Sequence, residues 1–404
     1  MADPSVSRRT FLERAAGVAG AVALGAAPHT HPRGAACGDG RRAAGEPPGR
    51  DAPPPIRAPA LTTRPFGRTG RDVCMLCMGT GTIAHTRPLD EVVRTLQYGL
   101  ERGITSIDTA PSYGAEEHVG RAIAGRRQGL FLATKTLERG YDGAMKELET
   151  SLKKLGTERL DLWQVHAIGH HGDSKKELAS LRKADGVMKA MCRMREQKVV
   201  DLIGFTGHAQ SAYMLDILRA RDLDFDTMLF IISAALVRRN QAGWENDVLP
   251  EGRRRGLGLI AMKVFGGGSG VGADKDQGTP AELLRYVWDR GLPTANVGLY
   301  SPAQIDAAVD ALRAYTPPND VAPADKPPAA PGDAPADSPS GESGARRGGP
   351  RANVGDRVGA RVRDDVFADR RARDAALRDR FHSIRLPFER PGYVDGAPLA
   401  ATPR

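Results

Sequence analysis

The feature that most constrains the fold is a regular alternation of short apolar runs and longer amphipathic stretches through the middle of the chain. The apolar runs fall at residues 73–78, 104–107, 130–133, 160–165, 199–205, 227–232, 257–262 and 294–299. Stretches with helical periodicity include residues 89–103, 141–155, 176–197, 209–220, 280–290 and 302–315. Eight strands that alternate with helices over this length predict an α/β fold, the (β/α)8 TIM barrel.

The residues around the start of the first run predict a closing element for the barrel. Residues 64–73 include Gly67, Thr69 and Gly70, a composition that suits a tight turn between two short strands. We therefore expect an N-terminal β-hairpin that covers the N-terminal end of the barrel. The barrel domain, with its hairpin, is predicted to span residues 61–316.

The segments on either side of the barrel differ from it in composition. Residues 32–60 are mostly Pro, Gly, Ala and Arg, whereas residues 317–353 contain one large aliphatic residue, Val321, and no aromatic residue. Such segments bury too little apolar surface to offset the entropy of ordering, so we expect a flexible linker and a disordered linker, respectively. Residues 354–404 form a basic tail that regains aromatic residues, which leaves a docked strap and a solvated arm both open.

Residues 1–31 have the pattern of an export signal. Arg8 and Arg9 are followed by a weakly apolar segment at residues 15–27, which is too short for a stable membrane span. The paired arginines resemble a twin-arginine (Tat) signal, which predicts export of the folded chain by the Tat machinery to the periplasm or another extracytoplasmic space. The alternative is a disordered basic terminus. Cys37 lies too far beyond the apolar segment to favour a lipid anchor.

Charge and cysteine content narrow the functional classes. Much of the net charge of +9 comes from arginines after residue 344, which alternate with aspartates and lack an aromatic stacking pattern. No nucleic-acid partner is therefore expected. The four cysteines are too few for a disulfide scaffold. Cys74 and Cys77 fall within an apolar run, so packing in a strand is the favoured interpretation and no metal site is expected.

Four titratable residues fall at the ends of three successive predicted strands. Asp108 ends the second strand, and Tyr113 follows it closely. Lys135 ends the third strand and His166 ends the fourth. Taken singly, each would be interpreted as a helix cap, a packing residue or a solvated charge. Because the C-terminal ends of barrel strands meet at one face, the four side chains are expected to converge on one pocket.

These residues lie within motifs that resemble the aldo-keto reductase family. The matching motifs are residues 64–70, 108–110, 113–114, 116–120, 133–135, 161–166, 204–208 and 260–268. The resemblance implies an enzyme that reduces a small-molecule carbonyl substrate with NADPH or NADH. It implies that Tyr113 donates the proton and that Lys135, held by Asp108, lowers the pKa of the phenol. His166 would orient the carbonyl oxygen.

The resemblance also implies a set of cofactor contacts, which include glycine-rich turns and a helix start that hold a diphosphate through backbone amides. They are Thr206, Gly207, Lys263, Gly266, Gly267, Gly298, Ser301 and Gln304. Four of these contacts depart from the family pattern. Thr206 and Gly207 stand at the carboxamide contact, and Leu229 and Ile232 stand at the nicotinamide stack. Tyr300 and Gln304 stand at the 2′-phosphate contact, and Ala307 and Ala308 stand at the adenine contact. The preference for NADPH or NADH therefore stays open.

Three functions are compatible with these patterns. The leading hypothesis is an exported NAD(P)H-dependent carbonyl reductase, because the four strand-end residues are those that such chemistry requires. The second is a dinucleotide-binding sensor without efficient turnover, which the altered cofactor contacts permit. The third is an interaction protein whose tail binds acidic partners.

Overall fold

A computed structural model describes residues 10–12, 60–169, 173–207, 209–234, 243–266 and 278–318 of the chain. Its central feature is a closed barrel of eight parallel strands in the order β10-β3-β4-β5-β6-β7-β8-β9, which confirms the predicted fold. The strands are β3 (Leu76–Gly79), β4 (Ser106–Asp108), β5 (Phe131–Thr136), β6 (Leu160–Val165), β7 (Val200–Thr206), β8 (Thr227–Ile231), β9 (Gly258–Met262) and β10 (Thr294–Val297). The predicted signal, linkers and tail lie almost entirely outside the described residues.

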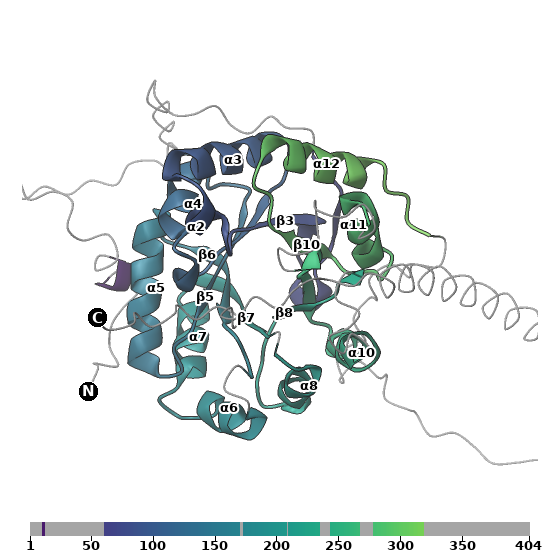
Figure 1. The fold of residues 1–404 in the computed structure, drawn as a ribbon. Helices are drawn as coiled ribbons and strands as arrows, with labels where there is room; N and C mark the ends of the chain where they lie inside the picture. The colour runs from purple at the N-terminus through teal and green to yellow at the C-terminus, as the bar shows by residue number, and fades with distance from the viewer. Residues whose placement is uncertain are drawn as a thin grey trace, which may run out of the picture.

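Helices surround the strands on all sides (Figure 1). They are α2 (Ile83–Thr86), α3 (Leu89–Glu101), α4 (Glu116–Ile123), α5 (Tyr141–Leu155), α6 (Ser174–Leu181), α7 (Val187–Glu196), α8 (Ser211–Arg219), α10 (Leu249–Arg254), α11 (Pro280–Trp288) and α12 (Pro302–Arg313). Their apolar faces pack on the outside of the strands and form the larger of the two buried clusters. Within the described part of the chain, none of the helices is long and apolar enough to cross a membrane.

The predicted helix at residues 176–197 is wrong in one respect, because the structure divides it into α6 and α7. The break coincides with tertiary pairing to the segment that precedes α5. Tyr141 donates its backbone N–H to Asp185 O over 2.8 Å, and Val187 donates to Arg139 O over 2.8 Å. Gly186 is extended at this point, with φ −91° and ψ 178°. The interruption therefore comes from contacts with a distant segment, which helical periodicity does not report.

The predicted first strand, residues 73–78, is also divided. Its first part belongs to the hairpin strand β2 (Asp72–Cys74), and its second part is the barrel strand β3. Met75 is the transition, because its N–H donates to Thr62 O while its carbonyl accepts from Ala295 N and from the indole of Trp288. Cys74 and Cys77 consequently lie on different strands, and both are buried free thiols.

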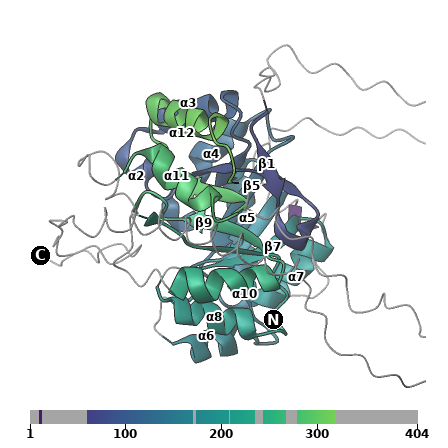
Figure 2. The same cartoon turned by 90° about the vertical axis from the view of Figure 1, so that its right-hand side faces the viewer.

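The hairpin predicted at the N-terminal end of the barrel is confirmed. Strand β1 (Thr63–Pro65) pairs antiparallel with β2, and Figure 2 shows β1 and α2 at opposite ends of the barrel. Phe66 and Val73 of this hairpin join the cluster of apolar side chains that fills the barrel interior. Gly67 adopts φ +57°, and a Cβ there would lie 2.4 Å from Gly256 O, so only glycine fits the contact.

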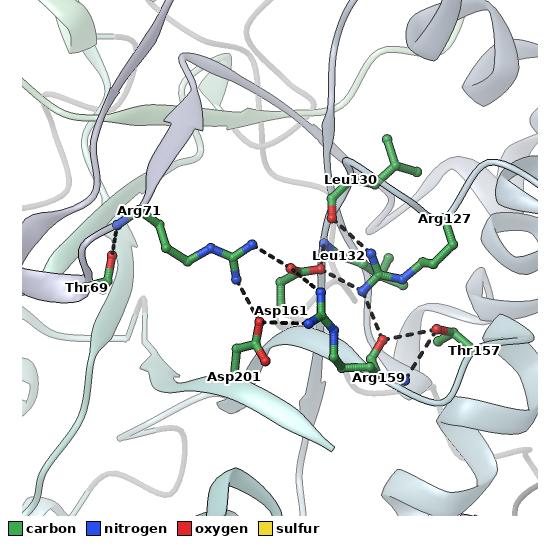
Figure 3. Close-up of polar contacts among 9 residues, drawn as sticks. All are labelled: Thr69, Arg71, Arg127, Leu130, Leu132, Thr157, Arg159, Asp161 and Asp201. Carbon is green, nitrogen blue, oxygen red and sulfur yellow. Dashed lines mark hydrogen bonds and ion pairs between the residues drawn. The ribbon is translucent and has the colours of Figure 1, made fainter. Parts of the chain in front are cut away.

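A charged network fastens the hairpin to the starts of the strands (Figure 3). Asp161 at the start of β6 is fully buried, and its carboxylate accepts from Arg71 over 2.8 Å and from Arg127 over 2.7 Å. It also accepts the backbone N–H of Leu132 over 2.9 Å. Arg71 reaches onward to Asp201 on β7 over 3.0 Å. The network therefore joins the hairpin, β5, β6 and β7 at the end of the barrel opposite the predicted site.

Candidate active site

The four predicted catalytic side chains are brought together at the C-terminal ends of β4, β5 and β6. Lys135 Nζ lies 2.5 Å from Asp108 Oδ1 and 4.7 Å from the centroid of the Tyr113 ring. The Tyr113 hydroxyl lies 3.4 Å from His166 Nε2. The phenol therefore has an ammonium group beside its ring and an imidazole beside its hydroxyl.

Local sequence presents Tyr113 toward the barrel mouth. The chain leaves β4 and forms a short 3-10 turn, η2 (Pro111–Tyr113), in which proline fixes the first backbone angle. Tyr113 donates its backbone N–H to Ala110 O over 3.0 Å. Gly114 then ends the turn with φ 65°, a conformation that favours glycine.

Burial and the ion pair set the electrostatics of the site. Lys135 and Asp108 are 1 % and 3 % exposed. Burial alone would lower the pKa of Lys135, but the Asp108 carboxylate and the Tyr113 side chain together outweigh burial and the pKa is raised. Burial raises the pKa of Tyr113, and the charge of Lys135 opposes that rise only in part. The lysine thus acts in the expected direction, while desolvation sets the net direction and keeps the phenol protonated at neutral pH.

Two neighbouring segments hold His166 in place. Its backbone N–H donates to Thr136 O over 2.8 Å, and its carbonyl accepts from Arg139 over 2.8 Å. Arg139 is itself fixed by Glu177, whose carboxylate lies 2.6 Å away. The next residue, Ala167, has φ 57°, an uncommon value for a residue other than glycine. The imidazole is therefore carried on a tightly constrained turn.

Sequence reasoning missed two polar residues that contact Asp108. Gln164 Nε2 donates to Asp108 Oδ2 over 3.0 Å, and Asn296 Nδ2 donates to Asp108 Oδ1 over 2.9 Å. Gln164 lies two residues before His166 in a run that is apolar except for Asp161, and Asn296 interrupts the apolar run of β10. A polar residue within an apolar strand at the mouth of the barrel was the available signal.

Thr206 and Gly207, the residues predicted to contact the nicotinamide carboxamide, are packed against other parts of the protein. Thr206 is 1 % exposed, and its hydroxyl accepts the backbone N–H of Ala167 over 3.2 Å. A Cβ on Gly207 would lie 2.5 Å from the sulfur of Met214 and 3.0 Å from Ile168 O, so the larger asparagine of the family pattern would require the Met214 side chain to move. Leu229 and Ile232 are buried as well. At these positions, buried packing therefore replaces the polar contacts to the nicotinamide that the family pattern predicts.

The predicted diphosphate contacts lie at the ends of β9 and β10. Lys263 follows β9 with φ 59°, and Gly266 donates its backbone N–H back to Lys263 O over 2.8 Å. Ser301 caps α12 by accepting from Gln304 N. Gly298 follows β10, and Gly267 lies outside the described residues. Backbone turns of this kind fit a diphosphate.

Tyr300 and Gln304, the residues predicted to contact the adenosine end of the cofactor, carry no charge. The Gln304 side chain accepts the backbone N–H of Tyr300 over 2.7 Å. The Tyr300 hydroxyl lies 2.5 Å from Thr82 Oγ1, and the position of a Gly298 Cβ would be 2.4 Å from that hydroxyl. Ala308 is fully buried and cannot face a ligand. Tyr300 therefore folds over Gly298 in place of a basic side chain.

Acidic, histidine and cysteine side chains do not gather into a metal site in the part of the chain that the structure describes. No group of three or more of them is placed there to hold a metal ion. At the barrel mouth, the described side chains bring together a phenol, an ammonium group, a carboxylate and an imidazole.

The fold and the site together define a closed (β/α)8 barrel that holds a tyrosine beside a buried lysine–aspartate pair at the C-terminal ends of its strands. A family model for the aldo/keto reductase family matches residues 75–315. The chain belongs to the aldo/keto reductase family, as the resemblance in its motifs predicts.

Similar proteins agree with this assignment. The methylglyoxal reductase DkgA of Escherichia coli is 35% identical over 127 residues, which cover 29% of this chain and 46% of that protein. An aldo-keto reductase of Mycolicibacterium paratuberculosis is 45% identical over 82 residues, 19% of this chain and 29% of that protein. The chain thus spans less than half the length of these curated relatives. The holo form of the aldo-keto reductase AKR11C1 from Bacillus halodurans superposes with a TM-score of 0.52 at 21% identity and covers 64% of this chain and 92% of that one.

Proposed function

We propose that this chain is an NAD(P)H-dependent reductase that converts an aldehyde or ketone to an alcohol, with Tyr113 as the general acid. The observation that carries the proposal is the Tyr113 phenol held between the Lys135 ammonium and the His166 imidazole at distances of 4.7 Å and 3.4 Å. Membership of the aldo/keto reductase family supports the same chemistry.

The proposed mechanism uses the two groups that flank the reacting oxygen. The Tyr113 hydroxyl and His166 Nε2 are close enough for one carbonyl oxygen to accept from both. The nicotinamide, when bound, supplies the hydride that forms the new C–H bond. As that bond forms, the oxygen takes the proton of Tyr113, and the O–H bond of the alcohol replaces the π bond of the carbonyl. Lys135 stabilises the phenolate left behind, which regains its proton from solvent.

The residues that would hold the cofactor fit it unevenly. Lys263, Gly266 and Ser301 provide a charge, a tight turn and a capped helix start for a diphosphate. At the other end, Tyr300 and Gln304 offer hydrogen bonds but no charge for a 2′-phosphate. We therefore propose that NADPH and NADH are used with little discrimination.

A second candidate function is a dinucleotide sensor without efficient turnover. The packed Thr206 and Gly207 favour it, because they replace polar contacts to the carboxamide. We further propose that the chain is exported by the Tat machinery, on the basis of Arg8 and Arg9, which lie outside the described residues. The loading of a dinucleotide before export would explain why a folded-protein pathway is used.

Replacement of Tyr113 by phenylalanine separates the enzyme from the sensor. Tyr113→Phe removes only the hydroxyl, so we expect unchanged cofactor affinity and a loss of turnover of about 100-fold or more. Binding is measured by fluorescence titration with NADPH and NADH, and turnover on a panel of aldehydes and ketones that includes methylglyoxal. Tyr98→Phe is the matched control, because the Tyr98 hydroxyl contacts Asp306 on the outer helices. A wild-type protein that binds cofactor and reduces no carbonyl compound would favour the sensor.

A further inference from the structure

The carboxylate of Asp108 is shared between the catalytic lysine and two neutral amides. Oδ1 accepts from Lys135 Nζ over 2.5 Å and from Asn296 Nδ2 over 2.9 Å. Oδ2 accepts from Gln164 Nε2 over 3.0 Å. Asn296 stands out among these donors, because it competes with Lys135 for the same oxygen and comes from β10, on the opposite flank of β3 from Asp108.

We propose that Asn296 is a positioning residue for carbonyl reduction, which acts through Asp108 to leave more of the Lys135 charge directed at Tyr113. The inference rests on the proposed reductase function and adds a residue to it. An ionised carboxylate bound only to Lys135 would neutralise most of the ammonium charge. An amide dipole pointed at the same oxygen compensates part of the carboxylate charge instead.

The orientation of Asn296 follows from the chemistry of its partner. A carboxylate only accepts hydrogen bonds, so the NH2 group and not the amide oxygen must face Asp108. The remaining atom, Asn296 Oδ1, is buried and accepts no hydrogen bond from the residues that the structure describes. A buried amide oxygen left without a donor is costly, so the contact with Asp108 is held at the expense of stability.

The neighbouring strand makes room for this arrangement. A Cβ on Gly79, at the end of β3, would lie 2.3 Å from Asn296 Oδ1. Real Cβ atoms do not approach so closely, and the nearest obstacle is a short side chain fixed at its other end by Asp108. Gly79 is therefore required for the amide to sit against the carboxylate. The two residues form a unit, Gly79 with Asn296, contributed by adjacent strands.

The charges around Tyr113 predict the sign of the effect. Lys135 lowers the pKa of Tyr113 and Asp108 raises it. His166 faces the hydroxyl, and Cys77 is the other titratable group close to Asp108. Removal of the Asn296 donor leaves the negative charge of Asp108 less compensated, so the phenol becomes a weaker acid.

The test compares Asn296→Leu, which keeps a branched side chain without the donor, with Asn296→Ala, which avoids overpacking. Both should lower kcat for carbonyl reduction several-fold with an unchanged KM for cofactor, and shift the alkaline limb of alcohol oxidation upward. The expected shift is about half a pH unit or more, which is about a threefold change in the ionisation constant. Thr294→Val is the matched control, since Thr294 lies on the same face of β10 and its buried hydroxyl has no partner in the described residues.

A second readout does not depend on turnover. The ionised fraction of Tyr113 at about pH 10 is obtained from absorbance at 295 nm, as the difference between each protein and its Tyr113→Phe counterpart. It should fall in Asn296→Leu and in Asn296→Ala and stay unchanged in Thr294→Val. An unchanged fraction in both Asn296 variants overturns the inference, even if the wild type reduces no carbonyl compound.

The role of Gly79 provides a double-mutant cycle. Gly79→Ala should displace the amide and reproduce the fall in Tyr113 ionisation in the wild-type background. In the Asn296→Ala background, where the obstructing oxygen is absent, the same substitution should add little. Additive effects of the two substitutions would show that they act separately and would overturn the proposed unit.

Discussion

Replacement of Asp161 by asparagine is a direct test of the charged network beneath the barrel (Figure 3). The substitution keeps the shape of the side chain and removes the charge that Arg71 and Arg127 approach at 2.8 Å and 2.7 Å. The asparagine side chain can still accept hydrogen bonds through its oxygen, but its NH2 group must then face a guanidinium or the N–H of Leu132. Breaking a buried pair from one side costs about 3–5 kcal/mol.

The partial exposure of the arginines places the expected cost at the lower end of that range. The side chains of Arg71 and Arg127 are 33% and 24% exposed, so water compensates part of the loss. About 3 kcal/mol corresponds to a fall in Tm of about 6–12 °C for a domain of this size. Chemical denaturation followed by circular dichroism measures the free energy of unfolding.

Asp201→Asn is the control for this prediction, because the Asp201 side chain is 28% exposed and accepts a hydrogen bond from Arg71 over 3.0 Å, with Arg159 farther away at 3.7 Å. It should cost about 1 kcal/mol or less. Below the unfolding midpoint, Asp161→Asn should keep wild-type kcat, because the network lies at the end of the barrel remote from Tyr113. Equal stability of the two variants would refute the assignment of Asp161 as the centre of the network.

Three further predictions concern other parts of the chain. Burial raises the pKa of Glu116 above its usual value of 4.5, so its contribution to stability is full below that value and is lost as the pH rises through the raised pKa. The Tm of Glu116→Gln relative to wild type should therefore rise between about pH 4.5 and 7, whereas a constant difference across that range would contradict the burial argument. Because Tyr300 and Gln304 carry no charge, the Kd values for NADPH and NADH from fluorescence titration should differ by less than about tenfold, or 1.4 kcal/mol; a strong NADPH preference would require a basic group elsewhere. Replacement of Arg8 and Arg9 by lysine should retain a reporter fused after residue 60 in the cytoplasm, and unchanged export would exclude a Tat signal.

Local sequence patterns predicted the elements whose ends are set locally. The helix expected at residues 141–155 is α5 at both ends, because Gly140 and Gly156 flank it and Gly156 adopts a left-handed conformation. The helix expected at residues 176–197 failed because its interruption is imposed by the backbone of Arg139 and Tyr141. Periodicity reports which face of a segment is buried, and it does not report a break created by a partner far away in the sequence.

The candidate active site shows the same difference between features set by local sequence and features set by distant partners. The rule that barrel strands deliver reactive groups at their C-terminal ends was enough to predict that Tyr113 and Lys135 lie close together, as they do in the structure. It did not find Asn296, because this residue meets Asp108 across 188 positions of sequence through the closure of the barrel between β10 and β3. Which inward polar side chains meet depends on the register of non-adjacent strands, and this is fixed only when the barrel closes.

In the part of the chain that the structure describes, Asp108 and Asp161 are buried at opposite ends of the barrel, and the partners of each determine what that end can do. Asp161 is surrounded by guanidinium groups, which bind a carboxylate in a fixed geometry, so this end contributes stability. Asp108 is paired with a lysine and two amides, and in our proposal these groups together set the acidity of the Tyr113 phenol. In this proposal, the end of the barrel with Asp161 contributes to the stability of the fold, and the end with Asp108 sets the acidity of Tyr113. Asp161→Asn should therefore lower the Tm without moving the pH profile, whereas Asn296→Leu should move the pH profile whatever its effect on the Tm.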